Sequence, residues 1–226
     1  MISGETRLVG LLGDPVSHSL SPLMQNAAFA ARALDWSYVP LAVPSDRLES
    51  ALAGLVALGF AGANVTTPHK QSAARLLGAA VSSVNTVVVR AGRLEGTSTD
   101  AAILDGLTFA QAAILGAGGA AEAFAAALPE AERFSRRGAW PPAVEGADVV
   151  VNATSERDEV LVQLHAGQTL VDLPYPATAT ARAAVQNGAR VVDGFDVLVA
   201  QGAASFELWT GTPAPVDVMR AAVRSA

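Results

Sequence analysis

The feature that most constrains the fold is a glycine-rich turn between an apolar strand and an alanine-rich helix. Residues 111–115 have the length and apolarity of a buried strand, and residues 120–128 are typical of a helix. Between them, Gly116, Gly118 and Ala121 give the spacing G-x-G-x-x-A. Gly116 allows the tight turn, Gly118 lets the backbone approach a pyrophosphate, and Ala121 permits close packing of the helix. The helix N-terminus would offer N–H groups to the phosphates. The alternative is a turn that merely needs flexible residues.

The context of this motif predicts a Rossmann-type dinucleotide-binding domain. The residues expected to contact the cofactor in the turn are Gly116, Ala117, Gly118, Gly119 and Ala120.

Strand-length apolar runs alternate with helical stretches along the chain, which indicates open, mostly parallel α/β sheets. In the first part we expect strands at 8–12, 38–43 and 62–67, a hairpin formed by 84–90 and 93–97, and helices starting at Ser21, at Ser45 or Asp46, and at Lys70. Ser21 is expected to be the N-cap of its helix, with Pro22 at the first helical position.

After residue 99 the pattern restarts. We expect strands at 111–115, 132–135, 147–152, 169–173 and 190–193, helices at 100–107, 120–128 and 177–187, and closing helices at about 196–209 and 215–225. The predicted fold is therefore two open, mostly parallel α/β units. One comprises 1–99 plus 203–226, and the other, of the Rossmann type, comprises 100–202.

The end of the second strand of the dinucleotide unit bears on the choice of cofactor. NAD sites usually place an acid there to bond the ribose 2′-hydroxyl. Here Ser135, Arg136 and Arg137 follow Phe134 instead. Because a guanidinium pairs with phosphate oxygens through a rigid fork, the sequence favours NADP over NAD. The alternative is a pair of solvated loop arginines.

Composition excludes several classes of function. The formal net charge is −6 and the pI near 5.0, which disfavours nucleic-acid binding. The chain has no cysteine, and its three histidines lack metal-ligand spacing, so no metal site is expected. No apolar run is long enough for a membrane span, and the first residues do not form a secretory signal. We expect a cytoplasmic protein acting on small molecules, as a monomer or homodimer.

Several segments together resemble the shikimate dehydrogenase family. They are 19–22 (S-x-S-P), 64–70 (N-V-T-x-P-x-K), Asn85-Thr86, 96–100 (G-x-x-T-D), 116–120 (G-A-G-G-A) and 193–203 (D-G-x-x-x-L-x-x-Q-G-A). The matches follow the family order and cover nearly the whole chain. They imply NADP-dependent, reversible reduction of 3-dehydroshikimate to shikimate, a step of aromatic amino-acid biosynthesis.

The resemblance also implies residue roles. Lys70 and Asp100 would handle the proton as the catalytic pair. The substrate carboxylate would be held by Ser19 and Ser21 with Tyr175, and the ring hydroxyls surrounded by Thr66, Asn85 and Gln201 together with the catalytic pair. Leu173 would form an apolar wall beside the cofactor, and Gly194 would lie near the nicotinamide carboxamide. The first unit would then bind substrate and the second NADP.

Other interpretations stay open. Lys70 could be a surface lysine, Asp100 an N-cap, Ser19 and Ser21 helix caps, and Tyr175 a packing residue. The activity could be that of a quinate or other cyclic hydroxy-acid dehydrogenase, although Ser21 is the residue type linked to shikimate use in the family. A non-catalytic paralogue that binds shikimate or nucleotide is a third alternative.

The chain also departs from the family pattern. It is short, and Pro141 and Pro142 prevent a crossover helix in 138–146. Residues 156–159 (Glu-Arg-Asp-Glu) stand where the family has a glycine-containing loop. These differences predict a simplified sheet edge and weaker cofactor binding.

Overall fold

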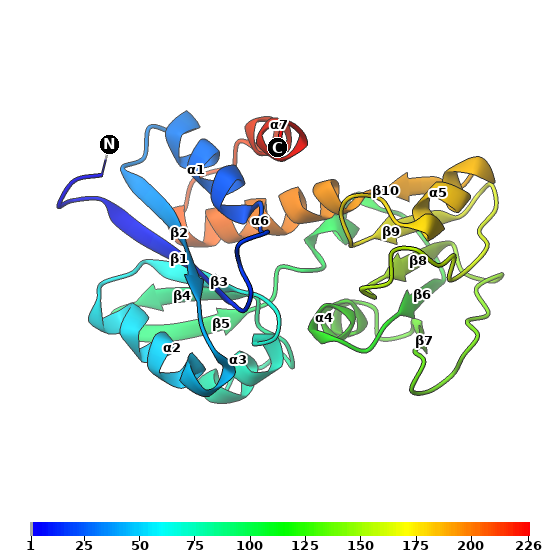
Figure 1. Ribbon diagram of the computed structural model, residues 1–226, viewed down its shortest axis with the longest axis horizontal. Helices are drawn as coiled ribbons and strands as arrows, with labels where there is room; N and C mark the ends of the chain where they lie inside the picture. The colour runs from blue at the N-terminus through cyan, green and yellow to red at the C-terminus, as the bar shows by residue number, and fades with distance from the viewer. Residues whose placement is uncertain (1) are drawn as a thin grey trace. The chain divides into compact units, whose positions relative to one another are not determined.

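The computed structural model describes residues 2–226, which form two compact units (Figure 1). The first consists of the chain up to Thr99 together with Val199–Ala226, and the second of Asp100–Leu198. The sequence predicts the return to the first unit at 203, whereas the structure places it at Val199. This boundary lies inside a continuous helix, where no break in the residue pattern marks it.

The first unit is built on a five-stranded sheet with the order β2-β1-β3-β4-β5. Its strands are β1 (Arg7–Gly13), β2 (Trp36–Ala42), β3 (Gly62–Val65), β4 (Thr86–Arg90) and β5 (Arg93–Thr97). β1 runs parallel to β2 and β3, whereas β4 pairs antiparallel with β3 and β5. The predicted hairpin is therefore confirmed, and β3 ends with its side chains buried next to β4.

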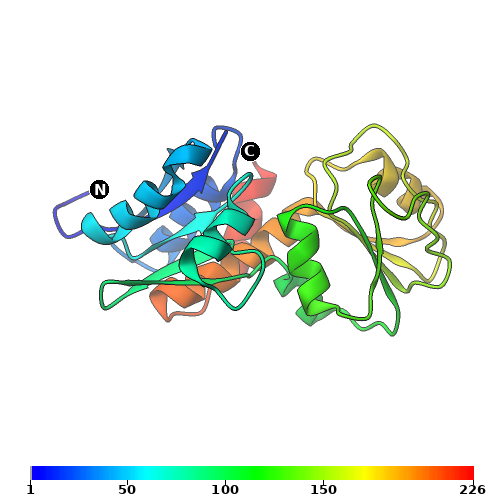
Figure 2. The ribbon, with the colours of Figure 1, turned by 90° about the horizontal axis from the view of Figure 1, so that it is seen from below.

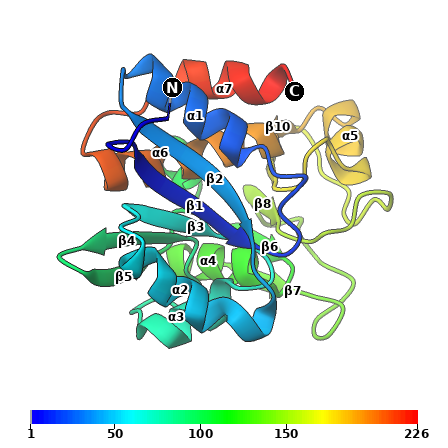
Figure 3. The ribbon, with the colours of Figure 1, turned by 60° about the vertical axis from the view of Figure 1, so that its left-hand side comes forward.

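Helices cover both faces of this sheet (Figure 3). One face carries α1 (Ser21–Ala31), α7 (Val216–Arg224) and the later part of α6 (Gly194–Thr210), and the other carries η1 (Ser45–Arg47), α2 (Leu48–Ala57) and α3 (Lys70–Leu77). Phe29 of α1 stacks on Phe206 of α6 with ring centroids 5.4 Å apart, whereas Leu52 and Ala73 pack in the opposite core. Apolar side chains thus bury both sheet faces.

Two predicted helix caps are wrong. Leu20, not Ser21, occupies the N-cap position of α1, which has no side-chain cap. Ser19 Oγ instead accepts a hydrogen bond from the Ser21 backbone N at 3.2 Å. Neither Ser45 nor Asp46 caps α2, because these residues form the η1 turn that leads into the helix.

The second unit has a fully parallel sheet with the order β10-β9-β8-β6-β7. Its strands are β6 (Ala112–Leu115), β7 (Glu132–Phe134), β8 (Val149–Asn152), β9 (Thr169–Asp172) and β10 (Arg190–Val192). Helix α4 (Gly119–Ala127) contributes Phe124 to one core, and α5 (Ala179–Gln186) contributes Ala181 and Ala184 to the other. The predicted α/β class is confirmed for both units.

One predicted helix of the second unit is replaced by a shorter element. The sequence predicts a helix at 100–107, but the structure has a 3-10 turn, η2 (Ala102–Gly106). Leu107 is already extended, so the turn ends after Gly106. Ile103 and Leu104 nevertheless pack against the core beside α4.

The connection from β7 to β8 contains no helix in the described structure (Figure 2). Trp140 and Val144 from this loop pack against the core in place of a helix. Strand β7 lies at the edge of the sheet, and the lack of a helix in this connection is what Pro141 and Pro142 predict. Among residues 2–226, no helix has the length and apolarity needed to cross a membrane.

Candidate active site

A buried polar network lies where β3 and β4 meet in the first unit. Asn64 Nδ2 donates to the backbone oxygen of Asn85 at 3.0 Å, to Thr86 Oγ1 at 3.2 Å and to Ser205 Oγ at 3.0 Å. Tyr38 Oη donates to Asn64 Oδ1 at 2.8 Å. All five side chains are buried, so their polar atoms depend on these bonds rather than on water. The network fixes the end of β3, from which the Thr66–Lys70 segment departs.

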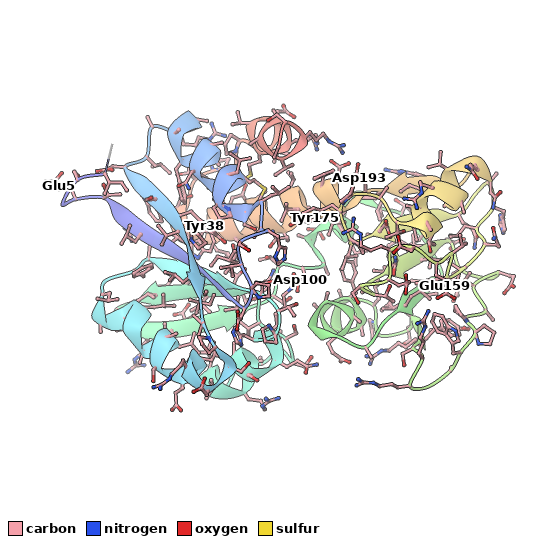
Figure 4. All side chains as sticks on the ribbon, viewed as in Figure 1. Glu5, Tyr38, Asp100, Glu159, Tyr175 and Asp193 are labelled. Atoms are coloured by element: carbon pink, nitrogen blue, oxygen red, sulfur yellow. The ribbon has the colours of Figure 1, made fainter. Side chains whose placement is uncertain are left out.

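Asn85 and Thr99 connect this network to the predicted substrate residue Gln201. Thr99 N donates to Asn85 Oδ1 at 2.7 Å, and Asn85 Nδ2 donates to Thr99 Oγ1 at 3.0 Å and to Gln201 Oε1 at 3.3 Å. Thr99 Oγ1 in turn donates to the Gln201 backbone oxygen at 3.0 Å. The amides of Asn85 and Gln201 are thereby brought together. Asp100 follows directly and is buried (labelled in Figure 4).

Lys70 begins α3 directly after the segment that follows β3. Its side chain is half-buried, and its backbone oxygen accepts a hydrogen bond from Val84 N at 3.0 Å, which places Lys70 beside Asn85 in the fold. The neighbouring His69 is buried, with Nε2 at 2.6 Å from Val43 O, which supports a structural role for it.

The basic residues of the chain are almost all of one type. Lys70 is the single lysine, and the other 14 are arginines. An arginine cannot release its proton in a protein, whereas a lysine can. A lysine at position 70 is therefore chemically distinct from every other cation of the chain.

Ser19 and Ser21 lie at the N-terminus of α1, with Ser21 buried and Ser19 half-buried. Ser21 shares a hydrogen bond with Tyr38, whose pKa is raised far above its ordinary value by burial, an effect that this bond partly offsets. Figure 4 shows Tyr38 on β2. A neutral Tyr38 hydroxyl thus joins Ser21 to Asn64, and the predicted carboxylate site to the buried network.

The glycine turn of the second unit has the geometry that a phosphate cradle needs. Gly116 adopts a φ of +125°, and a Cβ there would lie 2.9 Å from Ala153 O. Gly118 is the N-cap of α4, and a Cβ there would meet nothing within 4 Å, so the space before the helix N-terminus is open. These residues fit a dinucleotide pyrophosphate.

Arg136 is exposed and already has acidic partners within its own unit. Its guanidinium forms a hydrogen-bonded ion pair with Glu159 and lies 3.9 Å from Glu156 Oε2. It also lies over the ring of Trp140, 5.7 Å from the centroid. Ser135 and Arg137 lie on the same loop, and Arg137 is exposed.

Leu173, Tyr175 and Gly194 come together at the carboxyl ends of β9 and β10. A Cβ on Gly194 would lie 2.6 Å from Leu173 O and also against Pro174 O, so only glycine allows this approach. Tyr175 stacks on Phe195, with ring centroids 5.3 Å apart. Figure 4 labels Tyr175 and Asp193 in this region. Two predicted cofactor residues are thus neighbours, as a nicotinamide site requires.

Comparison with known proteins shows to which family the chain belongs. The model of the shikimate dehydrogenase substrate binding domain matches residues 11–87, and that of the shikimate 5′-dehydrogenase C-terminal domain matches residues 194–224. The chain is 40% identical to the shikimate dehydrogenase (NADP(+)) of Anaeromyxobacter sp. (strain Fw109-5), covering 99% of this chain and 98% of the relative. It belongs to the shikimate dehydrogenase family.

Other relatives agree. The shikimate dehydrogenase (NADP(+)) of Moorella thermoacetica is 40% identical, covering 100% of this chain and 95% of the relative. The solved structure of shikimate 5-dehydrogenase from Thermus thermophilus, in complex with NADP(H) and shikimate, is 31% identical with a TM-score of 0.83, covering 97% of this chain and 99% of that one.

Within this family the chain is shortened internally. Its alignment to the Anaeromyxobacter relative spans 272 positions although the chain has 226 residues, so at least 46 of those positions have no counterpart here.

The structure also adds residues to which the sequence assigned no role. Tyr38, Thr86 and Ser205 share the network of Asn64 and Asn85, and Tyr38 and Ser205 come from distant segments. The Asn-Thr pair at 85 and 86 is the one signal that could have indicated Thr86. Nothing local to Tyr38 or Ser205 predicts their role.

A second buried polar cluster involves Asp172 at the end of β9. Its carboxylate accepts hydrogen bonds from Asn152 Nδ2 at 2.7 Å, from Thr178 Oγ1 at 3.1 Å and from Thr178 N at 3.2 Å. Burial nevertheless raises the pKa of Asp172, and these bonds offset only part of the effect. The cluster holds the two ends of the 173–177 loop, which carries Leu173 and Tyr175.

We expect Asp172→Asn to destabilise the second unit by about 1–3 kcal/mol, because the amide presents a donor to groups that need an acceptor. The pH dependence should also change. Because the folded state raises the pKa of Asp172, its favourable contribution exists below the unfolded pKa and is lost as pH rises through the folded pKa. Thermal unfolding across the acidic range should show this loss in the wild type and not in the variant. The exposed Asp105→Asn is the control, and a variant with wild-type stability at every pH would contradict the prediction.

Proposed function

We propose that the protein is an NADP-dependent shikimate dehydrogenase, which interconverts 3-dehydroshikimate and shikimate. The observation that carries this proposal is the buried amide network of the first unit, which orders Asn85 and Gln201, together with the backbone bond from Val84 N to Lys70 O, which places the single lysine of the chain beside Asn85. The relatives named for this activity match over essentially the whole chain, which supports it. The protein acts in the cytoplasm as a monomer or homodimer.

The residues that hold the substrate come mainly from the first unit. Ser19 and Ser21 bind its carboxylate, with Tyr175 assisting, and the hydroxyl of Ser21 is oriented by its bond to Tyr38. Thr66, Asn85 and Gln201 surround the ring hydroxyls. Because Asn85 Oδ1 accepts a hydrogen bond from Thr99 N at 2.7 Å, the amide of Asn85 is oriented in advance of substrate binding.

Lys70 and Asp100 handle the proton. Lys70 accepts it from the hydroxyl that is oxidised and returns it to the carbonyl oxygen in the reverse reaction, while Asp100 orients the ammonium. When bound, the cofactor would provide the hydride acceptor for oxidation as NADP and the hydride donor for reduction as NADPH. The turn at 116–120 would hold its pyrophosphate, Arg136 with Ser135 and Arg137 its 2′-phosphate, and Leu173 and Gly194 its nicotinamide.

Turnover of the purified protein tests the proposal. With shikimate and NADP, we expect the absorbance of the reduced cofactor to rise, with lower rates when NAD replaces NADP or quinate replaces shikimate. Thermal stabilisation by shikimate and NADP without turnover with either cofactor would show a binding protein and overturn the enzyme assignment. Faster turnover of quinate would instead overturn the choice of substrate.

A further inference from the structure

The acidic partners of Arg136 belong to the loop that follows β8. Glu159 pairs with the Arg136 guanidinium, and Glu156 lies 3.9 Å from the same nitrogen. The three side chains are exposed or half-buried, so solvent and ligand can reach them. Figure 4 labels Glu159 on the second unit. Two carboxylates therefore face Arg136, one of the two guanidiniums that are expected to bind the 2′-phosphate.

The loop is held in this arrangement by its own backbone. Glu156 Oε1 accepts hydrogen bonds from the backbone N of Arg157 at 2.9 Å, of Asp158 at 3.0 Å and of Glu159 at 3.3 Å. These bonds and the charge of Arg136 lower the pKa of Glu156. At the start of the loop, Thr154 Oγ1 accepts from Glu156 N at 3.3 Å and donates to Asn152 Oδ1 at 2.7 Å. The negative charges are thus fixed near Arg136 rather than dispersed in a random loop.

We propose that Glu156 and Glu159 form an internal competitor for the 2′-phosphate and thereby set the NADP-to-NAD preference of this protein. The inference rests on the proposed use of NADP. A 2′-phosphate is strongly anionic and needs the fork of Arg136, so it must displace Glu159 and approach Glu156. NAD has a neutral 2′-hydroxyl at that position, so its binding requires neither the displacement of Glu159 nor the approach of a negative charge to Glu156. The loop therefore weakens the binding of NADP but not that of NAD, and it reduces the difference in affinity between the two cofactors.

The expected size of the change in affinity follows from the solvent exposure of Arg136 and Glu159. Exposed ion pairs contribute little, and like-charge repulsion between exposed groups is screened by salt. We therefore expect Glu159→Gln to raise the affinity for a 2′-phosphorylated ligand about three- to tenfold, with a smaller gain at high salt. The affinity for NAD should stay within about twofold of the wild type, because no pairing with Arg136 is lost on binding.

Calorimetric titration of the full chain tests the proposal. The ligands are adenosine 2′,5′-bisphosphate, NADP and NAD, and the proteins are the wild type, Glu159→Gln, Arg136→Ala and both changes together. Glu145→Gln is the control, since Glu145 is exposed on the preceding loop. We expect the gain with Glu159→Gln to disappear when Arg136 is absent, as a double-mutant cycle requires.

Three outcomes would overturn the competitor role. One is an unchanged affinity of Glu159→Gln for the bisphosphate. The others are an equal gain in affinity for NAD and NADP and a gain matched by Glu145→Gln, either of which would indicate a general charge effect. Failure of the proposed function is distinguishable, because wild-type protein that binds the bisphosphate but does not oxidise shikimate at saturating cofactor leaves the titration pattern intact.

Discussion

Replacing Lys70 by alanine or by arginine should lower kcat for shikimate oxidation by about two to four orders of magnitude, the usual contribution of a general acid–base group. Alanine removes the proton acceptor. Arginine keeps the positive charge but cannot release a proton, so it should fail almost as completely. Stopped-flow or steady-state assays at saturating NADP measure the effect. A Lys70→Arg variant with wild-type kcat would show that only the charge at this position matters.

The composition of the chain allows an independent measurement on the same residue. Because Lys70 is the single lysine, reductive methylation with labelled formaldehyde should give one side-chain signal besides that of the N-terminal amine. We expect that signal to shift when shikimate is added and to be absent from Lys70→Arg. An unperturbed signal at saturating shikimate would place Lys70 away from the substrate, whatever the kinetics of the variants.

The second large effect is expected from Gly194→Ala, which should lower kcat/KM for the cofactor. The added Cβ would lie 2.6 Å from Leu173 O and also against Pro174 O, and backbone atoms cannot move aside cheaply. Either the start of α6 or the loop carrying Leu173 and Tyr175 must shift. A displacement of about 1 Å at a reacting site can cost about a hundredfold in rate, so we expect a loss of about that size in kcat/KM for the cofactor.

A matched control separates this effect from glycine substitution in general. Gly54 lies inside α2, where a Cβ would meet nothing within 4 Å. Gly54→Ala should leave kcat/KM unchanged and raise the free energy of unfolding by about 0.5–1 kcal/mol. If Gly194→Ala instead keeps both its melting temperature and its kcat/KM, the close approach at 194 has no functional importance.

The elements that the sequence predicts well are those with a local signal. The glycine turn is an example, because the spacing of Gly116, Gly118 and Ala121 between an apolar strand and a helix can be read within about ten residues, and the positive φ of Gly116 agrees with it. The β4–β5 hairpin is another, since alternation and a short turn suffice to define it. The helix that contains Gln201 starts at Gly194 rather than at 196, because Asp193 Oδ1 accepts from Asp196 N at 3.0 Å and so extends the helix.

The sequence could not predict the hydrogen bonds and ion pairs that form between distant segments. Ser205 reaches Asn64 across 141 positions of the chain, and Arg136 reaches Glu159 across 23. No periodicity or motif encodes which polar groups will meet once the sheets are assembled. The sequence therefore indicated the arginine that suits a 2′-phosphate but not the carboxylates facing it. The roles assigned to individual site residues remain predictions.

The outermost strand of the second sheet has a consequence for association between copies of the protein. An edge strand exposes a row of unpaired backbone groups, which can pair with another chain. Here the edge strand, β7, has three residues, and the first two, Glu132 and Arg133, are charged and exposed. Arg133 is also paired with Glu122 of α4, which keeps its charge beside the strand. Strand β7 is therefore a poor template for the addition of another strand, and this edge of the sheet disfavours aggregation.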